Sequence, residues 1–461
     1  MKRRFIFGLV VVALLLNLAV GAKIYLSAAQ ASNNDDSAQQ NLEVFTDAMQ
    51  KIRSEYVDGK DLKYQQLVYA ALKGMVGKLD PHSEFLDETS FQQLQDDTEG
   101  QFGGLGLVVA IKDGYVTVVA PMEDTPGFRA GILTGDRIVR VDGKSVDKQP
   151  LTEVVQQLRG EPARRPNPGE GHAVLTEVVK QLRGEPGSAV TLAVERPSTG
   201  VTKNYTLLRA VIQMIMVKDI NGKKEFPLDE NKIGYLRITQ FAEKTADELE
   251  SALGKLKRQG MKGLIIDLRW NPGGLLEQAV EVCQKFLPRG QLVVSTEGRR
   301  LMEKYFAKGD GDELKNVPIV VLVNLGSASA AEIVTGCLQD LHRAVILGEK
   351  TFGKGSVQTI FPLEDGSALK LTVAKYYTPS HKVIHQHGIM PDILVPVSDE
   401  EEAAILLKRA PGAVESLPEK DRVRVSEIRD EQADRAEDLL KGLIIYDTLN
   451  GVPKPEKVAA K

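Results

Sequence analysis

The chain has 461 residues, of which 42% are hydrophobic, so it is long and apolar enough to bury more than one core. Its net charge of −4 at pH 7 offers no broad basic surface of the kind that binds nucleic acid. We therefore expect protein substrates or partners and no nucleic acid.

Residues 1–31 have the features of an export segment. Three basic residues precede an uncharged apolar run at 5–20, and residues 29–31 offer a small-residue cleavage site. The apolar character continues, so residues 5–26 also fit an uncleaved membrane anchor. We expect an anchor in the inner membrane, with secretion after cleavage as the alternative. Either way, the bulk of the chain should lie in the cell envelope on the periplasmic side.

Residues 32–97 are expected to form a linker followed by a small helical region. The stretch at 33–40 is polar, whereas Val44 and Ile52 belong to an apolar series with helical spacing. An Asp-Pro pair at 80–81 then breaks the helical pattern.

Residues 98–212 change to glycine-rich turns and short strands. Residues 102–109 are rich in glycine, and residues 135–143 read Gly-Asp-x-Ile-x-x-Val-x-Gly. This pattern resembles a PDZ domain, in which loop N–H groups capture a C-terminal carboxylate while the peptide adds a strand to an open sheet edge. A glycine-rich hairpin without a ligand is the alternative. The resemblance implies a site for apolar protein C-termini at Gly103, Gly104, Leu105 and Gly106.

This region contains an internal duplication. Residues 151–162 recur at 175–186 with a single change, Gln156 to Lys180. Each copy has apolar residues at i, i+3, i+4 and i+7, which predicts a short amphipathic helix. A PDZ domain needs only one such helix beside its peptide groove. Because the second copy leads directly into the predicted strand at 190–194, we expect it to fill that position and the first copy to be a surface insertion.

Residues 213–396 alternate between strand-like and helical patterns. Strand-like runs occur at 233–238, 263–268 and 318–323, with a helical pattern at 246–259 between the first two. This alternation predicts an α/β core.

Ser329 follows one of these runs at a predicted strand-to-helix corner. Residues 319–323 are continuously apolar, and residues 325–334 read Leu-Gly-Ser-Ala-Ser-Ala-Ala-Glu-Ile-Val. Such a corner places a serine hydroxyl beside the free backbone N–H groups of the first helical turn, which can hold an oxyanion. Close packing of small residues is the alternative interpretation.

Lys354 lies between two glycines, in a loop after the strand-like run at 344–347. Lysine is a poor base at its ordinary pKa of about 10.4, but burial disfavours the ammonium form and lowers that pKa. A neutral amine within reach of a serine can take its proton, and Gln358 could orient that amine. A solvated turn is the alternative interpretation.

Two ligand signatures are weak. The run from Gly348 to Lys354 spells the start of a phosphate-binding loop, but Gly355 stands where Ser or Thr is required and a strand-like run follows. Three histidines between 381 and 387 surround a turn that has no assigned acidic partner. We therefore expect no nucleotide, no metal and no other cofactor.

Two further features bear on the environment of the chain. Cys283 and Cys337 both fall in predicted helices, and we expect buried thiols without a disulfide. Residues 397–461 are charged with a helical pattern, and we expect them to be a solvated face with a modest docking stripe.

Three motifs in the predicted core resemble the carboxy-terminal processing peptidases, also called tail-specific proteases. They are Asp-Leu-Arg-Trp-Asn-Pro-Gly-Gly at 267–274, Gly-Ser-Ala-Ser-Ala-Ala-Glu at 326–332 and Gly-Lys-Gly-Ser-Val-Gln at 353–358. Their order and spacing also match those of the family, and the resemblance runs from about residue 42 to residue 396. It implies an α/β peptidase core of the crotonase/ClpP-like type with an inserted PDZ domain and helical N- and C-terminal regions.

The resemblance also implies roles for individual residues. Ser329 would be the nucleophile, Lys354 the general base and Gln358 the group that positions the lysine. Trp270 departs from the family, which more often has a polar or small residue at this position, and the departure concerns the substrate groove. The oxyanion hole would come from the backbone N–H groups of Ala330, Gly273 and Gly274.

We therefore expect an exported serine endopeptidase that recognises protein C-termini through its PDZ domain and cleaves near them through an acyl-enzyme. A catalytically silent PDZ adaptor that only captures tails is the main alternative. An acyl-transfer enzyme with a similar core is a second alternative, but the sequence shows no nucleotide or acyl-carrier pocket. The physiological substrate, the oligomeric state and the need for an activating adaptor are left open.

Overall fold

The computed structural model describes residues 37–57, 62–112, 115–122, 125–133, 135–146, 181–300, 302–309, 314–409, 414 and 419–450. The chain divides into two compact units, residues 1–85 and 86–461. The expected export segment and most of the duplicated segment lie outside the described residues. In the part that is described, no helix is both long and apolar enough to cross a membrane.

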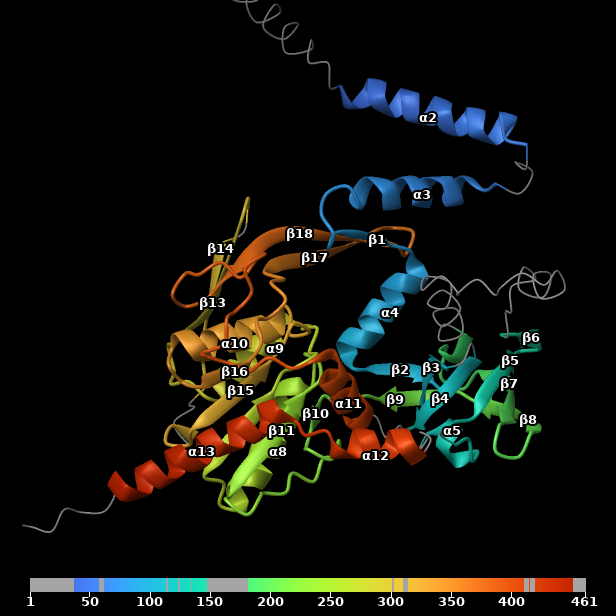
Figure 1. Cartoon of the computed structure of the whole chain (residues 1–461). Coiled ribbons are helices and arrows are strands. Elements are labelled where there is room, and N and C mark those ends of the chain that lie inside the picture. Colours follow the sequence, from blue (N-terminus) through green and yellow to red (C-terminus); the bar gives the residue numbers. More distant parts are fainter. Residues whose placement is uncertain are drawn as a thin grey trace, which may run out of the picture. The chain divides into compact units, whose positions relative to one another are not determined.

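The first unit contains helices α2 (Ala38–Glu55) and α3 (Tyr64–Val76), shown in blue in Figure 1. Ser37 caps α2, because its hydroxyl accepts a hydrogen bond from the backbone N–H of Gln40. The ring of Tyr69 on α3 packs 4.8 Å from that of Phe85, in the short strand β1 (Glu84–Leu86). The helical region expected near the N-terminus is therefore present.

The second unit begins with α4 (Glu88–Glu99) and an antiparallel sheet of order β3-β4-β5-β7-β8. Strand β3 forms one edge of this sheet, and a separate ladder joins β2 to β9. Leu182, near the end of the second copy of the duplicated segment, packs into the core of this sheet. The elements are β2 (Gln101–Gly104), β3 (Leu107–Lys112), β4 (Tyr115–Pro121), α5 (Pro126–Arg129), β5 (Arg137–Val141), β6 (Lys144–Ser145), β7 (Ala189–Arg196), β8 (Val201–Leu208) and β9 (Ala210–Gln213).

The predicted α/β core is a mainly parallel sheet of order β10-β11-β12-β15-β16-β19, in which only β10 is antiparallel to its neighbour. Every residue of β12 and β15 is buried, as expected for strands covered on both faces. Helices α8, α9 and α10 pack on one face, while Ala436 and Leu440 of α13 (Glu431–Asn450) pack on the other. The elements are β10 (Val217–Lys218), β11 (Ile233–Ile238), α8 (Thr245–Arg258), β12 (Gly263–Asp267), α9 (Leu276–Gln284), β15 (Ile319–Val323), α10 (Ala330–Asp340), β16 (Val345–Gly348) and β19 (Ile393–Leu394).

A second antiparallel sheet pairs β17 with β18, β18 with β13, and β13 with β14. Four of its five strands are β13 (Leu292–Gly298), β14 (Met302–Phe306), β17 (Ser356–Pro362) and β18 (Ala368–Tyr377). The chain continues with α11 (Asp399–Arg409), α12 (Glu419–Glu427) and α13 (Glu431–Asn450). These three helices are the predicted charged helical C-terminal region.

Cys283 on α9 and Cys337 on α10 are buried free thiols that face each other in the core. Burial raises the pKa of the Cys283 thiol, and the contact with Cys337 adds to that effect.

Candidate active site

Ser329 lies where β15 leads into α10, at the predicted strand-to-helix corner. Its φ of 55° is unusual for a residue other than glycine, and the side chain is almost fully buried. The backbone N–H of Ser329 donates to Oε2 of Glu332, which lies in the first turn of α10. This carboxylate therefore stabilises a backbone conformation that would otherwise cost free energy.

The loop that carries Lys354 is attached to this corner. The backbone N–H of Phe352 donates to the carbonyl oxygen of Ser327 at 3.0 Å. The backbone N–H groups of Gly353 and Lys354 donate to Glu332 at 2.7 and 2.8 Å. Residues 329 and 354 are thus brought together through one carboxylate, as the motif spacing predicts.

Two opposing effects act on the Glu332 carboxyl. Burial raises its pKa, because desolvation disfavours the charged form. Hydrogen bonds from the Thr351 hydroxyl and from the backbone of Ser329, Gly353 and Lys354 oppose that shift. The ionised carboxylate satisfies all four donors, two at each oxygen.

The side chain of Lys354 is partly buried. Desolvation lowers its pKa, the positive charge of Lys370 lowers it further, and Glu332 acts in the opposite direction. Within the described residues, no hydrogen bond joins the Ser329 hydroxyl to the Lys354 amine. Gln358 lies near the start of β17, where Nε2 donates to the hydroxyls of Ser356 at 2.8 Å and Thr372 at 3.3 Å. No hydrogen bond joins Gln358 to Lys354 in the part of the chain that the structure describes.

The glycine turn predicted for the oxyanion hole lies against Ser329. A Cβ atom on Gly273 would stand 2.6 Å from Cβ of Ser329, so only glycine fits. The N–H of Gly273 donates to Oδ1 of Asn271 at 2.8 Å, so it is not available to an oxyanion. Among the described residues, the N–H groups of Gly274 and Ala330 have no acceptor. The N–H groups of Gly274 and Ala330 are therefore available to an acceptor and that of Gly273 is not, while the close contact with Ser329 requires glycine at 273 for a steric reason.

The predicted carboxylate loop of the PDZ domain is shorter than expected. Gly103 and Gly104 belong to β2 and pair with β9, so they do not lie in an open loop. Leu105 and Gly106 follow the strand, both are buried, and no acceptor for their N–H groups occurs in the described ranges. Gly106 has a φ of 69°, and a Cβ there would lie 2.3 Å from Thr125. The glycine-rich sequence therefore predicted the position of the loop, but not that β2 extends to Gly104.

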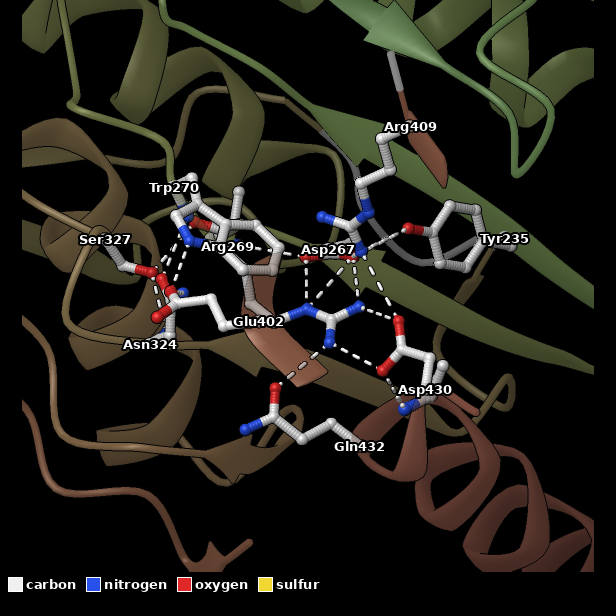
Figure 2. Close-up of polar contacts among 12 residues, drawn as sticks. Tyr235, Asp267, Arg269, Trp270, Asn324, Ser327, Glu402, Arg409, Asp430 and Gln432 are labelled. Carbon is white, nitrogen blue, oxygen red and sulfur yellow. Dashed lines mark hydrogen bonds and ion pairs between the residues drawn. The ribbon is translucent and has the colours of Figure 1, made fainter. Parts of the chain in front are cut away.

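Sequence reasoning missed a buried polar cluster beside the glycine turn (Figure 2). Asp267 and Arg269, both with fully buried side chains, form an ion pair at 2.7 Å. Arg409 on α11 pairs with Asp267 at 2.5 Å, and Asp430 just before α13 pairs with Arg269 at 2.8 Å. Burial alone would raise the pKa of Asp267, but the two guanidinium groups hold it well below its usual range. The C-terminal region, for which only a modest docking stripe was expected, is therefore attached to the core by these ion pairs, and no local pattern marks its contacts with residues so distant in sequence.

In the described part of the chain, no cluster of His, Cys, Asp and Glu side chains could hold a metal ion. His381 instead contacts Oε1 of Glu297 at 2.8 Å and stacks on the ring of Tyr377.

Fold and site together define a serine-type peptidase that carries a PDZ domain. Residues 232–395 match peptidase family S41, and residues 117–167 match the PDZ domain family. The chain is 41% identical over 378 residues to a carboxy-terminal-processing protease of Bartonella bacilliformis, covering 81% of this chain and 79% of that protein. It is 35% identical over 347 residues to a carboxyl-terminal-processing protease of Synechocystis, covering 75% and 74% of the two chains. The chain belongs to the carboxy-terminal processing proteases of peptidase family S41.

A solved structure of the photosystem II D1 C-terminal processing protease is also similar, with 28% sequence identity and a TM-score of 0.42. The match covers 82% of this chain and 99% of that one.

Proposed function

We propose that this protease is anchored in the cell envelope, captures protein C-termini with its PDZ domain and cleaves near them with Ser329 and Lys354. The observation that carries the proposal is the Glu332 carboxylate, which accepts the backbone N–H groups of both residues. It holds a serine on a strained corner beside a lysine whose pKa is lowered mainly by burial. Those are the two requirements of a serine-lysine mechanism.

The reaction follows from these positions. The neutral Lys354 amine accepts the Ser329 hydroxyl proton while Oγ attacks the scissile carbonyl carbon. The tetrahedral oxyanion accepts hydrogen bonds from the N–H groups of Ala330 and Gly274. The Lys354 ammonium then returns its proton to the leaving amine, and the C–N bond breaks to give an acyl-enzyme. Lys354 then deprotonates a water molecule, whose oxygen attacks the acyl carbonyl carbon. The bond from that carbon to Oγ breaks as the Lys354 ammonium protonates Oγ, which releases the new C-terminus and restores Ser329.

Gln358 completes the arrangement as the residue that orients Lys354. Both of its hydrogen bonds use Nε2, so Oε1 remains to accept a hydrogen bond from the lysine ammonium. Catalytic hydrogen bonds tighten when substrate binds, so we expect Ser329, Lys354 and Gln358 to approach one another in the complex with a peptide.

Two features of the PDZ domain support capture of C-termini. The N–H groups of Leu105 and Gly106 can bind a terminal carboxylate, and β3, which follows them, is an edge strand to which a peptide can add. An apolar side chain at the C-terminus of the bound peptide would then contact the hydrophobic core of the PDZ domain, to which Leu105 belongs. The cleavage assay described below can also test whether binding of a C-terminus to the PDZ domain activates the enzyme, and whether an adaptor protein increases cleavage.

The cellular location is proposed from residues 5–26, whose apolar run after basic residues fits an anchor with the catalytic region on the periplasmic side. Fractionation of cells that express the full chain tests this part. Retention in the membrane fraction at full mass supports an anchor, whereas a soluble periplasmic product shortened near residue 31 indicates cleavage.

The central test is mass spectrometry of an unfolded protein with an apolar C-terminus after incubation with the full-length protease. Ser329→Ala and Lys354→Ala should both abolish cleavage, while Lys350→Ala, at an exposed lysine in the adjoining loop, should retain it. A substrate with an amidated C-terminus should be cleaved more slowly, because the carboxylate that the PDZ loop binds is gone. Cleavage that survives Ser329→Ala would exclude the mechanism, and tail binding without any cleavage would point to the adaptor alternative.

A further inference from the structure

The turn that supplies the proposed oxyanion donor begins at a strained residue, because Trp270 has positive φ without being a glycine. Trp270, Gly273 and Gly274 all have positive φ, at 57°, 99° and 142°. Such a turn keeps one geometry only when its surroundings hold it there. Part of that support comes from within the core, because Asn271 donates to the carbonyl of Ile238 and accepts the N–H of Gly273.

The other part comes from the C-terminal region. The indole Nε1 of Trp270 donates to Oε1 of Glu402 on α11 at 2.6 Å. The same oxygen accepts Nδ2 of Asn324 at 3.3 Å, while Oδ1 of Asn324 accepts the backbone N–H of Trp270 at 2.9 Å. Figure 2 shows Trp270, Asn324 and Glu402 grouped in this way. Glu402 therefore binds the indole of Trp270 directly. It also binds Asn324, whose side chain accepts the backbone N–H of Trp270.

Two arginines that take part in ion pairs also contact the indole ring of Trp270. The guanidinium carbons of Arg409 and Arg269 lie 4.6 and 5.4 Å from the indole ring. Both arginines are bound to Asp267, and Arg269 also binds Asp430. The segment that leads into the glycine turn is thus held by charges from both α11 and the start of α13.

We propose that Glu402 is a positioning residue for catalysis, and that the C-terminal helices act through Trp270 to fix the turn that places the Gly274 N–H. The inference rests on the proposed function, since it assigns that N–H to the oxyanion hole. It concerns orientation, because Glu402 reaches Trp270 and Asn324 and not the reacting groups. Small displacements of such donors reduce the rate of the chemical step more than the affinity for substrate.

The chain offers a direct readout, because Trp270 is its only tryptophan. The fluorescence of the full-length enzyme therefore reports on the Trp270 environment alone. Glu402→Ala should shift the emission maximum and lower kcat by about tenfold or more, with KM within about twofold of the parent. Glu402→Gln keeps an oxygen acceptor and should lose much less. Glu400→Ala, on the same helix but paired with Arg424, is the matched control and should change neither.

A double-mutant cycle with Trp270→Phe then tests whether the two residues act as one. If Glu402 acts through the indole N–H, adding Glu402→Ala to Trp270→Phe should cause little further loss of kcat. Unchanged kcat in Glu402→Ala, a loss confined to KM, or an equal loss in Glu400→Ala would each overturn the inference. Failure of the proposed function itself is seen separately, as cleavage that does not require Ser329.

Discussion

The carboxylate of Glu332 accepts the backbone N–H of Lys354 at 2.8 Å, and the same oxygen accepts that of Ser329 at 2.9 Å. The proposed base and nucleophile come from different loops, one after β15 and one after β16. A single buried side chain therefore binds the backbone of both residues, and its removal should affect both stability and catalysis.

Glu332→Gln tests the role of this carboxylate in binding the backbones of Ser329 and Lys354. Each oxygen of Glu332 accepts two donors, so whichever way a glutamine amide is turned, its NH2 group faces two N–H or O–H donors. We expect the free energy of unfolding to fall by about 1–3 kcal/mol, with a large loss of kcat. Denaturant unfolding and peptide kinetics measure the two effects. Glu277→Gln, in the exposed first turn of α9, is the control, and parent-like kcat in Glu332→Gln would contradict the assigned role.

The pH dependence of activity should follow Lys354. In the proposed mechanism the base is the neutral amine, so kcat/KM should rise with pH through the pKa of Lys354, which desolvation lowers below its ordinary value. Lys370 lowers that pKa further. Lys370→Gln should therefore raise the pKa and move the rising limb of the profile to higher pH. Lys304→Gln, at an exposed site on β14, should leave it in place, and a shift to lower pH in Lys370→Gln would be inconsistent with this electrostatic coupling.

Features of this site that depend on local sequence were predictable. The apolar run of β15 and the small residues after it predicted the Ser329 corner, because strand burial and helix initiation are both local signals. Motif spacing then predicted that Lys354 lies near it. The error at Gly103 and Gly104 has a physical reason, because these residues are ordered by pairing with β9, which lies far along the chain.

Contacts made by the C-terminal region could not be predicted in this way. Glu402, Arg409 and Asp430 lie in charged stretches that look like solvated helix faces, and only the folded chain brings them to Trp270 and Arg269. Likewise, the sequence indicates that Gly273 must be small but not that its N–H donates to Asn271. Side-chain partners that are distant in sequence carry no periodic signal.

Gly273→Ala should inactivate the enzyme for a steric reason. The added Cβ would lie 2.6 Å from Cβ of Ser329 and 2.9 Å from the Ala330 nitrogen, so the proposed nucleophile and a proposed oxyanion donor must move. We expect kcat to fall by about a hundredfold or more. Gly290→Ala is the matched control, because it has a similar positive φ of 86° but no atom near the new Cβ. Comparable losses in both variants would show that backbone strain, rather than contact with Ser329, is responsible.

Arg237→Met should stabilise the fold. Arg237 lies directly opposite Lys218 in the β10–β11 ladder, and its Nε is buried without an acceptor in the described part of the chain. Burial lowers the pKa of Lys218, and the charge of Arg237 lowers it further. Removing one of two opposed like charges should raise the free energy of unfolding by about 0.2–1 kcal/mol. Denaturant unfolding measures this, with exposed Arg258→Met as control, and a marked loss of stability would mean that Arg237 has a partner not seen here.

Deleting residues 151–174 tests the duplication directly. These residues lie outside the described part of the chain, but Leu182 of the second copy is 6% exposed and packs with Val190 and Leu192. If the second copy fills the PDZ helix position, the deletion shortens a surface insertion, and the melting temperature should stay within a few degrees of the parent. Deleting 175–186 instead removes Leu182 from the core, so its melting temperature should fall sharply. The reverse pattern in thermal unfolding would assign the helix position to the first copy.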